Sequence, residues 1–413
     1  MIKLEKCLHP MLEGREGKVI LKKIQDEMVA QGIEYLVLTN QSSMFYATGY
    51  LGIQARLSPG GTIVVVPVEG NPSLIISTLE SADAYACTRD VEVLEYMSWV
   101  FVDDGSEESR REKGDIMDPD APAKLTLDLL KKKPLQGKIG LEIQTIPNKL
   151  YAKLAAQLPE GSIVDGGEVI AKARVIKTPW EISMLRLAAQ ELDKAWKCVA
   201  ADLKPGMPAW KLDALFIYYS GKFNLEHGTM SRYQTFIPAA GPYFDLSGMP
   251  RGYILKEGDV IKFDVGYKYL GYNSDIARTF AVGGTASDAV CQVYEALYKG
   301  NRLGVSMLKP GVKMSDVYQA VRAEVEKCPL IPHYPRGHVG HSIGCNIDAE
   351  EHPTFSPGSQ AVLQENMVVC LETPYSGTGN APVVGGFNLE DTHAITADGH
   401  ESFTENPDNI FWK

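Results

Sequence analysis

The phrase Leu-Lys-Pro-Gly occurs twice, at residues 203–206 and 308–311, and is the feature that most restricts the fold. Each copy ends a long segment with helical spacing of apolar residues and precedes a second such segment, at 212–222 and 315–327. The two copies lie 105 residues apart, which is too far for a solenoid unit. This predicts two related αβ halves that face each other across a pseudo-two-fold cleft. The alternative is that the phrase is merely a common helix stop.

The first third of the chain has a different pattern. Between Gly32 and Ile143, helical segments alternate with short β-rich runs at 35–39, 62–68, 73–77, 91–96 and 139–143. Strands separated by helices are typical of an α/β domain. After Pro179 the pattern changes to one long amphipathic helix, stopped by Pro205 and Gly206. We therefore expect two domains, at residues 1–168 and 169–413.

Composition excludes several classes of function. The chain has 41 Lys and Arg against 52 Asp and Glu, a net charge of -11, which argues against a nucleic-acid partner. No run approaches the roughly 18 apolar residues of a membrane span, and the N-terminus lacks the apolar region of a signal peptide. We therefore expect a cytoplasmic protein that does not enter a membrane. The 7 cysteines contain no Cys-x-x-Cys pair, so neither a disulfide framework nor a thiolate zinc site is indicated.

Four carboxylates lie within or beside apolar runs in the second domain. Asp264 ends one run, and Asp275 follows a turn through Gly271, so that a hairpin would bring the two face to face. Glu372 and Glu390 lie in the runs VVCLE and FNLE. An unpaired buried carboxylate costs several kcal/mol or takes up a proton, so these side chains require a cation.

His341 adds one imidazole to these oxygen donors. Such a set favours Mn²⁺, Fe²⁺, Co²⁺ or Zn²⁺, and four carboxylates carry enough charge to balance two divalent ions. Two adjacent ions activate water and polarise a carbonyl group, which is the chemistry of hydrolysis. The alternative is that the acids are ordinary strand-end or surface residues.

These residues carry a resemblance to a known family. The successive segments DVG, GYNSDIARTF, GHSIG, LETP and LEDTHAIT resemble the signatures of the pita-bread metallohydrolases, which include Xaa-Pro aminopeptidase, prolidase and creatinase. The segments FYATGY and ARVIKTPWEISMLRLA resemble the two-domain prolidase and creatinase branch. The resemblance implies a creatinase-like α/β N-terminal domain, an α+β pita-bread catalytic domain with duplicated halves, and hydrolysis of a peptide or peptide-like C–N bond.

The resemblance also implies roles. Asp264 would bind one metal ion, His341 and Glu372 would bind the other, and Asp275 and Glu390 would bridge the two ions, with Mn²⁺ as the first choice. Glu372 would also carry the proton from the nucleophile to the leaving nitrogen. A homodimer, in which the partner's N-terminal domain completes the substrate cleft, is implied as well.

The residues that would face the substrate depart from the family pattern. Gly248 and Gly337 stand where histidines are usual, and His338 is displaced by one position, where it would either hold substrate or bond to the backbone. Asp348 replaces another histidine and would suit a cationic substrate group or act as a base, and Asn388 replaces an arginine. Arg336 and Tyr334 precede the histidine segment and would either bind a substrate carboxylate or lie in a surface loop.

These departures leave several functions open. The first is an Xaa-Pro peptidase-like hydrolase that acts on small peptides. The second is hydrolysis of a small C–N compound, as in the creatinase branch. The third is a metal-assisted lyase resembling the dimethylsulfoniopropionate lyases, which use an aspartate shortly after the ligand histidine; Asp348 is similar, but Gly266 stands where those lyases have a further aspartate. The fourth is a binding protein without turnover.

Overall fold

The computed structural model describes residues 10–52, 58–97, 118–227, 232–236, 239–240, 252–346, 349–377 and 381–411. The chain divides into two compact units, Met1–Arg174 and Val175–Lys413. Each unit contains its own hydrophobic core and is described separately. Among the described residues, no helix is both long and apolar enough to cross a membrane.

The first unit is built on a six-stranded sheet with the order β4-β3-β2-β1-β5-β6. Its strands are β1 (Ile33–Leu38), β2 (Ile63–Pro67), β3 (Ser73–Ser77), β4 (Glu92–Tyr96), β5 (Lys138–Leu141) and β6 (Ile163–Asp165). The five β-rich runs of the sequence thus form strands, and β6 is an addition that the sequence pattern did not indicate. The antiparallel pairs β1–β2 and β2–β3 join parallel pairs on both sides, so the sheet is mixed.

Short helices connect these strands and supply apolar side chains to the core. They are α1 (Pro10–Glu13), α2 (Gly17–Ala30), α3 (Gln41–Thr48), α5 (Ser81–Cys87), α7 (Ala121–Leu130), α8 (Asn148–Ala155) and α9 (Gly167–Ala173). Leu127 and Leu130 of α7 pack with Leu154 of α8 against the strand residues Val37 and Ile139. The creatinase-like α/β architecture expected from the sequence is confirmed.

The second unit begins with the long helix α10 (Pro179–Asp202). Thr178 caps its first turn, because its hydroxyl accepts from the Glu181 amide while the Glu181 carboxylate accepts from the Thr178 amide. Leu185, Leu192 and Trp196 of the predicted apolar face are completely buried. The helix ends before Pro205, as its sequence predicts.

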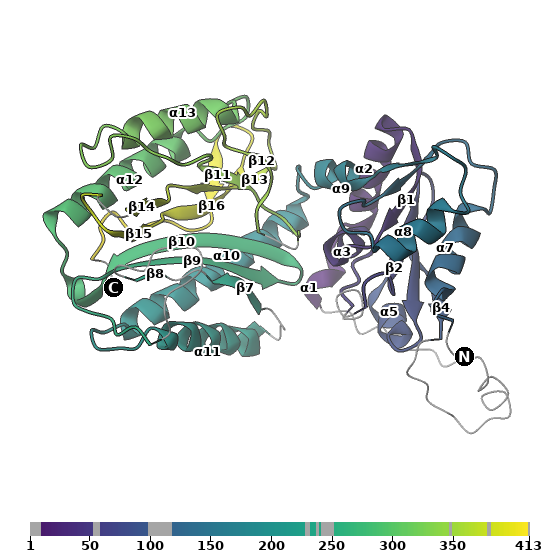
Figure 1. Cartoon of the computed structure of the whole chain (residues 1–413), viewed down its shortest axis with the longest axis horizontal. Coiled ribbons are helices and arrows are strands. Elements are labelled where there is room, and N and C mark those ends of the chain that lie inside the picture. The colour runs from purple at the N-terminus through teal and green to yellow at the C-terminus, as the bar shows by residue number, and fades with distance from the viewer. Residues whose placement is uncertain are drawn as a thin grey trace, which may run out of the picture. The chain divides into compact units, whose positions relative to one another are not determined.

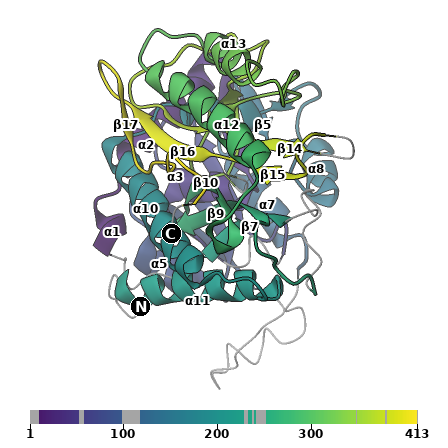
Figure 2. The same ribbon diagram turned by 90° about the vertical axis from the view of Figure 1, so that its left-hand side faces the viewer.

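A nine-stranded sheet and two pairs of helices make up the rest of this unit. Figure 1 shows α10 and α11 (Trp210–His227) on one side of the sheet and α12 (Asp288–Ser306) and α13 (Met314–Val325) on the other, and Figure 2 shows the same layers from the side. The strand order is β12-β11-β13-β16-β10-β9-β7, with β17 beside β16 and β8 beside β9. The strands are β7 (Arg232–Phe236), β8 (Ala239–Ala240), β9 (Val260–Tyr269), β10 (Tyr272–Ala281), β11 (Gly340–Ser342), β12 (Glu351–Thr354), β13 (Val368–Glu372), β16 (Glu390–Ile395) and β17 (His400–Ser402), while β14 (Tyr375–Gly377) and β15 (Gly385–Phe387) form a separate hairpin.

The two Leu-Lys-Pro-Gly phrases have matching backbone contacts. The amide of Gly206 donates to the Leu255 carbonyl at 2.7 Å, and the amide of Gly311 donates to the Leu363 carbonyl at 2.9 Å. Both glycines have positive φ angles, of 85° and 88°. The duplication predicted from the repeated phrase is therefore present, and the phrase is more than a helix stop.

Candidate metal centre

The hairpin of β9 and β10 holds the first two carboxylates. It turns through Leu270 and Gly271, whose φ angles are 45° and 87°, as a two-residue hairpin turn requires. Asp264 lies opposite Ala277, two residues from Asp275 on the same strand. Because side chains alternate between the faces of a sheet, Asp264 and Asp275 are diagonal neighbours on one face. The predicted hairpin therefore brings the two carboxylates together.

Two neighbouring strands add the glutamates. Strand β16 lies between β10 and β13, with Glu390 opposite both Ala277 and Glu372. One oxygen each of Asp264, Asp275 and Glu390 lies within 4.8 Å of the others. We call Asp264, Asp275, Glu372 and Glu390 the carboxylate cluster.

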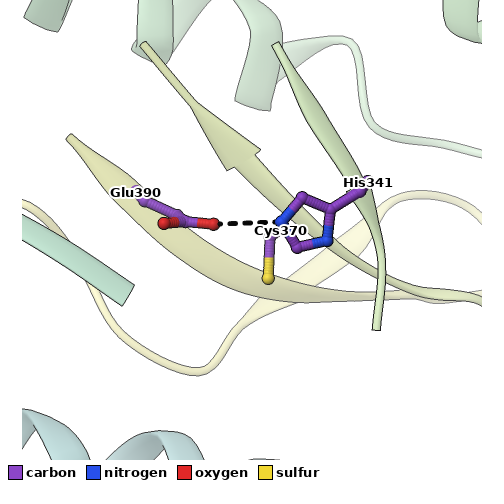
Figure 3. A group of neighbouring side chains, drawn as sticks. All are labelled: His341, Cys370 and Glu390. Carbon is purple, nitrogen blue, oxygen red and sulfur yellow. Dashed lines mark ion pairs between the residues drawn. The ribbon is translucent and has the colours of Figure 1, made fainter. Parts of the chain in front are cut away.

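His341 enters the same site from β11, which pairs with β13. Its Nδ1 lies 2.9 Å from the carbonyl oxygen of Ser342. A carbonyl can only accept, so Nδ1 carries a proton, and Nε2 is the ring nitrogen that faces the carboxylates. Nε2 lies 3.5 Å from Glu390 Oε1 and 4.0 Å from Asp275 Oδ2, and Figure 3 shows the imidazole directed toward Glu390. Nε2 is therefore the nitrogen that would bind a metal ion, with Nδ1 held by the backbone.

Cys370 lies beside His341 and Glu390, as Figure 3 shows, and its sulfur is close enough to share a cation with them. Its thiol instead donates to the Asp275 carbonyl at 3.6 Å. Burial and the nearby Glu390 raise the pKa of this thiol well above its ordinary value. Cys370 is thus a neutral donor that supports the strand of Asp275.

The carboxylate cluster fits a divalent cation. Burial, followed by repulsion from neighbouring carboxylates, raises the pKa of both Asp275 and Glu390 well above the ordinary range. Glu390 is 1% exposed, and its Oε1 has no hydrogen-bond partner among the described residues. A buried acceptor in this state is costly unless a proton or a metal ion satisfies it. The Glu390 oxygen without a hydrogen-bond partner, 3.5 Å from Nε2 of His341, makes this cluster a candidate cation site.

Glu372 has a different environment, because it already has positive and polar partners. Arg336 Nη2 donates to its Oε1 at 2.9 Å, and Asn388 Nδ2 donates to its Oε2 at 3.1 Å. His338 Nδ1 lies 3.3 Å from Oε1. Burial opposes ionisation of Glu372, but Arg336, His341 and His338 together hold its pKa below the ordinary value. These partners favour the ionised form of Glu372.

Lys262 contacts the opposite end of the carboxylate cluster. It lies two residues before Asp264 on the same face of β9, is 5% exposed, and its Nζ is 3.5 Å from Asp264 Oδ2. Asn388 Nδ2 also approaches this oxygen, at 3.4 Å. Burial raises the pKa of Asp264 and Lys262 lowers it, with a net increase.

A buried ion network fixes the strand that carries Glu390. Asp391, which is completely buried, forms ion pairs with Arg278 at 3.0 Å and with Arg302 at 3.1 Å. Arg278 also donates to the Glu390 carbonyl oxygen at 2.7 Å. These bonds hold the backbone of β16 in place from the side opposite the carboxylate cluster, because successive strand residues face opposite sides.

The remaining sequence candidates have different outcomes. His338 makes no backbone hydrogen bond through its ring among the described residues and lies between Arg336 and Glu372. Arg336 and Tyr334 are not surface-loop residues, because Arg336 bonds to Glu372 and Tyr334 is 1% exposed. Gly337 is exposed and places no side chain in the site. Asp348 and Gly248 lie outside the described residues.

Sequence reasoning missed Lys262 and the part played by Asn388. A lysine inside the apolar run VIKFD, two residues before a candidate ligand, is the pattern that identifies the first, because residues i and i+2 share a face of a strand. In the sequence, Asn388 stands out only because the family pattern has an arginine at this position. Its amide bridges Asp264 and Glu372, which no sequence spacing indicates.

Comparisons with known proteins agree with this architecture. Residues 183–397 match the model of metallopeptidase family M24, and residues 20–176 match that of the creatinase/prolidase N-terminal domain. An Xaa-Pro dipeptidase from Lactobacillus helveticus is 24% identical over 389 residues, covering 93% of this chain and 96% of that protein. Ectoine hydrolase from Halomonas elongata is also 24% identical, over 421 residues, covering 95% of this chain and 96% of that protein. The solved structure of an Xaa-Pro dipeptidase from Bacillus anthracis has the same fold, with a TM-score of 0.79, 21% identity, and coverage of 96% of this chain and 99% of that one.

Proposed function

Because the chain belongs to metallopeptidase family M24, and is therefore a metal-dependent peptidase, we propose that it hydrolyses Xaa-Pro dipeptides or closely related small peptides. The observation that carries this proposal is that Asp264, Asp275 and Glu390 form one group of potential ligands, and that Glu390 also belongs to a second group with His341. Glu390 Oε1 is unsatisfied among the described residues. The similarity to an Xaa-Pro dipeptidase along nearly the whole of both chains supports the choice of substrate.

We propose that Asp264, Asp275, His341, Glu372 and Glu390 hold two divalent ions, with Mn²⁺ as the first choice because most donors are oxygens. Such ions lower the pKa of bound water and polarise the scissile carbonyl. The chain's own contribution is to carry four carboxylates and one imidazole on neighbouring strands of one sheet, whose hydrogen bonds keep them in a fixed arrangement.

In this proposal Glu372 moves the proton. Its carboxylate takes a proton from the attacking water and delivers it to the nitrogen of the leaving group. Arg336 and Asn388 fix both carboxylate oxygens by hydrogen bonds at 2.9 and 3.1 Å, so the group does not need to reorganise during the reaction. His338, whose ring lies beside this pair and is partly exposed, is in position to contact the substrate.

The second candidate is hydrolysis of a small non-peptide C–N compound. Two observations favour keeping it: the ectoine hydrolase match is as extensive as the dipeptidase match, and the substrate-facing residues at 337 and 388 depart from the peptidase pattern. Asp348 also bears on the choice between peptide and non-peptide substrates, because it would act either as a base or as a partner for a cationic substrate group. The lyase and the binding protein gain no support from the described residues.

A substrate screen separates the two candidates. We expect the Mn²⁺-loaded protein to cleave Xaa-Pro dipeptides, with kcat/KM for ectoine and simple amides at least about a hundredfold lower, since a differently shaped substrate loses several contacts in the transition state. Release of proline and of ectoine products can be followed by chromatography in parallel. Turnover of ectoine or the amides without cleavage of any Xaa-Pro peptide would move the assignment to the second candidate.

The homodimer and the cytoplasmic location expected from the sequence stay predictions. A homodimer is supported only by the family resemblance, and light scattering of the purified protein tests it directly. A mass close to twice the chain mass of 45.3 kDa is expected.

A further inference from the structure

The outer face of the helix α11 is apolar and exposed. It consists of six residues that we call the α11 stripe, namely Trp210, Ala214, Ile217, Tyr218, Gly221 and Leu225. The exposed fractions of its four large side chains are 48%, 50%, 63% and 87% in chain order. Figures 1 and 2 show α11 as the outermost helix on its side of the second unit. Because monomeric proteins rarely expose a continuous apolar patch, the α11 stripe indicates a contact surface.

The α11 stripe is separate from the side of the helix that packs on its own unit. At about 100° per residue, the six positions fall within an arc of about 100°. Leu212, Phe216 and Ser220 lie on the other side of the helix and are at most 4% exposed. The core of the second unit is therefore complete without the α11 stripe, which is available to a partner.

We propose that the α11 stripe is the surface on which two copies of this chain meet, with their α11 helices packed antiparallel about a two-fold axis. The family resemblance implies a homodimer through the partner's N-terminal domain, and this contact is a different one. It does not depend on the proposed hydrolytic function.

The spacing of the α11 stripe is symmetric about a point midway between Ile217 and Tyr218. Trp210 and Leu225 are equally far from this midpoint, and so are Ala214 and Gly221. An antiparallel two-fold pair centred there brings each residue level with its counterpart in the partner, so the same surface serves both copies. The small residues flank the midpoint, where they allow the two helices to approach closely. A surface that matches itself in this way favours a second copy as the partner.

A groove beside the first half of the α11 stripe gives the partner's side chains a place. It has a volume of about 480 Å³ and is lined by Trp210, Asp213, Ala214, Ile217 and Gly252. In the antiparallel pair the second half of the partner's helix lies over this groove. The partner's Leu225, a position that is 87% exposed in the single chain, comes level with Trp210.

The charges at the two ends of α11 favour the antiparallel direction. Lys211 is exposed in the first turn and Glu226 is exposed in the last turn. The helix dipole adds positive partial charge at the first end and negative partial charge at the last. Antiparallel packing brings Lys211 close to the level of the partner's Glu226, whereas parallel packing would place like ends together.

The exposed area is large enough for a specific contact. A large aromatic side chain buries roughly 150–250 Å², and two aromatic and two aliphatic side chains of the α11 stripe are about half to nine-tenths exposed. Two copies would together bury on the order of 1,000 Å², which is the size that a specific interface reaches.

Oxidative cross-linking tests the pairing. Position 218 lies beside the two-fold axis, and at an interaxial distance of about 8–10 Å its two copies come within reach of a disulfide. Tyr218→Cys is therefore expected to give at least about half of the chains as a disulfide-linked dimer on a non-reducing gel.

Lys222→Cys is the matched control. It is also exposed on α11, but it lies beside the α11 stripe and further from the midpoint. At about 1.5 Å per residue its two copies are about 13 Å apart along the helix axis, too far for a disulfide. This variant and the wild type, which has 7 cysteines of its own, are expected to give less than about a tenth of the chains as linked dimer.

Light scattering of Ile217→Asp gives a second measurement. Ile217 is 50% exposed, so the aspartate is solvated in a single chain, but it would be buried without a partner in the pair. The mass is expected to fall from about twice the chain mass to close to 45.3 kDa. Val362→Asp places the same charge at an exposed apolar residue outside α11 and is expected to leave the mass unchanged.

Each contrary result overturns the contact through α11. A wild-type mass of one chain would show that the α11 stripe does not pair, as would a Tyr218→Cys variant that is linked no more than Lys222→Cys. A dimer that persists in Ile217→Asp would show that the copies meet on another surface. Linked dimers in a protein that cleaves no Xaa-Pro peptide would contradict the proposed function and leave this contact in place.

Discussion

Replacement of Glu372 by glutamine is expected to lower kcat at least about a thousandfold while most of the bound metal is retained. General acid–base transfer by a positioned carboxylate contributes on the order of 10² to 10⁴ in rate, and an amide cannot accept the proton. Metal is retained because the carbonyl oxygen of the introduced glutamine replaces one ligand oxygen and the other ligands are unchanged. Steady-state hydrolysis of an Xaa-Pro dipeptide and elemental analysis of the same sample measure the two quantities.

Glu365→Gln is the control for this change. Glu365 precedes the same strand β13, is exposed, and has no described bond to the carboxylate cluster, so kcat is expected to stay within about twofold. A Glu372→Gln variant that turns over at the wild-type rate with its metal in place would remove Glu372 from the proton path. A variant that loses all metal would make Glu372 chiefly a ligand.

The second large effect concerns stability. Asp391→Asn is expected to destabilise the second unit by about 3 kcal/mol, because removal of the shared carboxylate from a buried ion network leaves Arg278 with Asp193 as its one remaining described acid and takes the described acid away from Arg302. Asp391 is completely buried, forms an ion pair with Arg278, and accepts hydrogen bonds from Arg302, Thr404 and Asn406. In the asparagine variant an NH₂ group replaces one acceptor and faces these donors. Urea unfolding followed by tryptophan fluorescence measures the loss, since Trp196 is buried in this unit.

This stability difference depends on pH in a defined direction. Burial opposes ionisation of Asp391, but Arg278 and the other neighbouring cations hold its pKa below the ordinary value of 3.8. A carboxyl whose pKa is lower in the folded state contributes its full stability above the unfolded pKa and loses it as the pH falls toward the folded pKa. The difference between wild type and Asp391→Asn should therefore be constant above about pH 5 and shrink below 3.8.

Asp398→Asn is the control for the stability measurement. Asp398 is exposed in the loop between β16 and β17 and accepts only from Thr396 among the bonds described, so its replacement should cost less than about 0.5 kcal/mol. Equal unfolding midpoints for wild type and Asp391→Asn at neutral pH would show that the network does not stabilise this unit.

The fold was predictable where local pattern and burial agree. The runs at 35–39 and 62–68 became β1 and β2, and the helix after Thr178 began and ended where its capping box and Pro205 require. Strand β6 (Ile163–Asp165) was missed because three residues with an exposed aspartate carry no alternation of burial. The pairing of β16 between β10 and β13 joins segments far apart in the chain, and no local pattern specifies it.

The carboxylates of the candidate site were predictable because acidic residues are unusual inside apolar runs. Asp264 and Glu390 stood out because burial of a charge requires a partner. The groups that tune the site did not stand out: the bonds of Arg336 and Asn388 to Glu372 depend on how loops and strands meet in space. Lys262 was missed because a single lysine in a strand is usually a solvated residue, and only the structure shows that this one is buried.

The central claim, a peptidase whose activity depends on metal held by this cluster, is tested most directly by one titration. The purified protein is stripped with a chelator, Mn²⁺ is returned in steps, and bound metal per chain and the rate of Xaa-Pro dipeptide hydrolysis are measured on each sample. The rate is predicted to fall to background on stripping and to return with bound metal, up to two ions per chain. Hydrolysis that continues undiminished in metal-free protein would contradict the account.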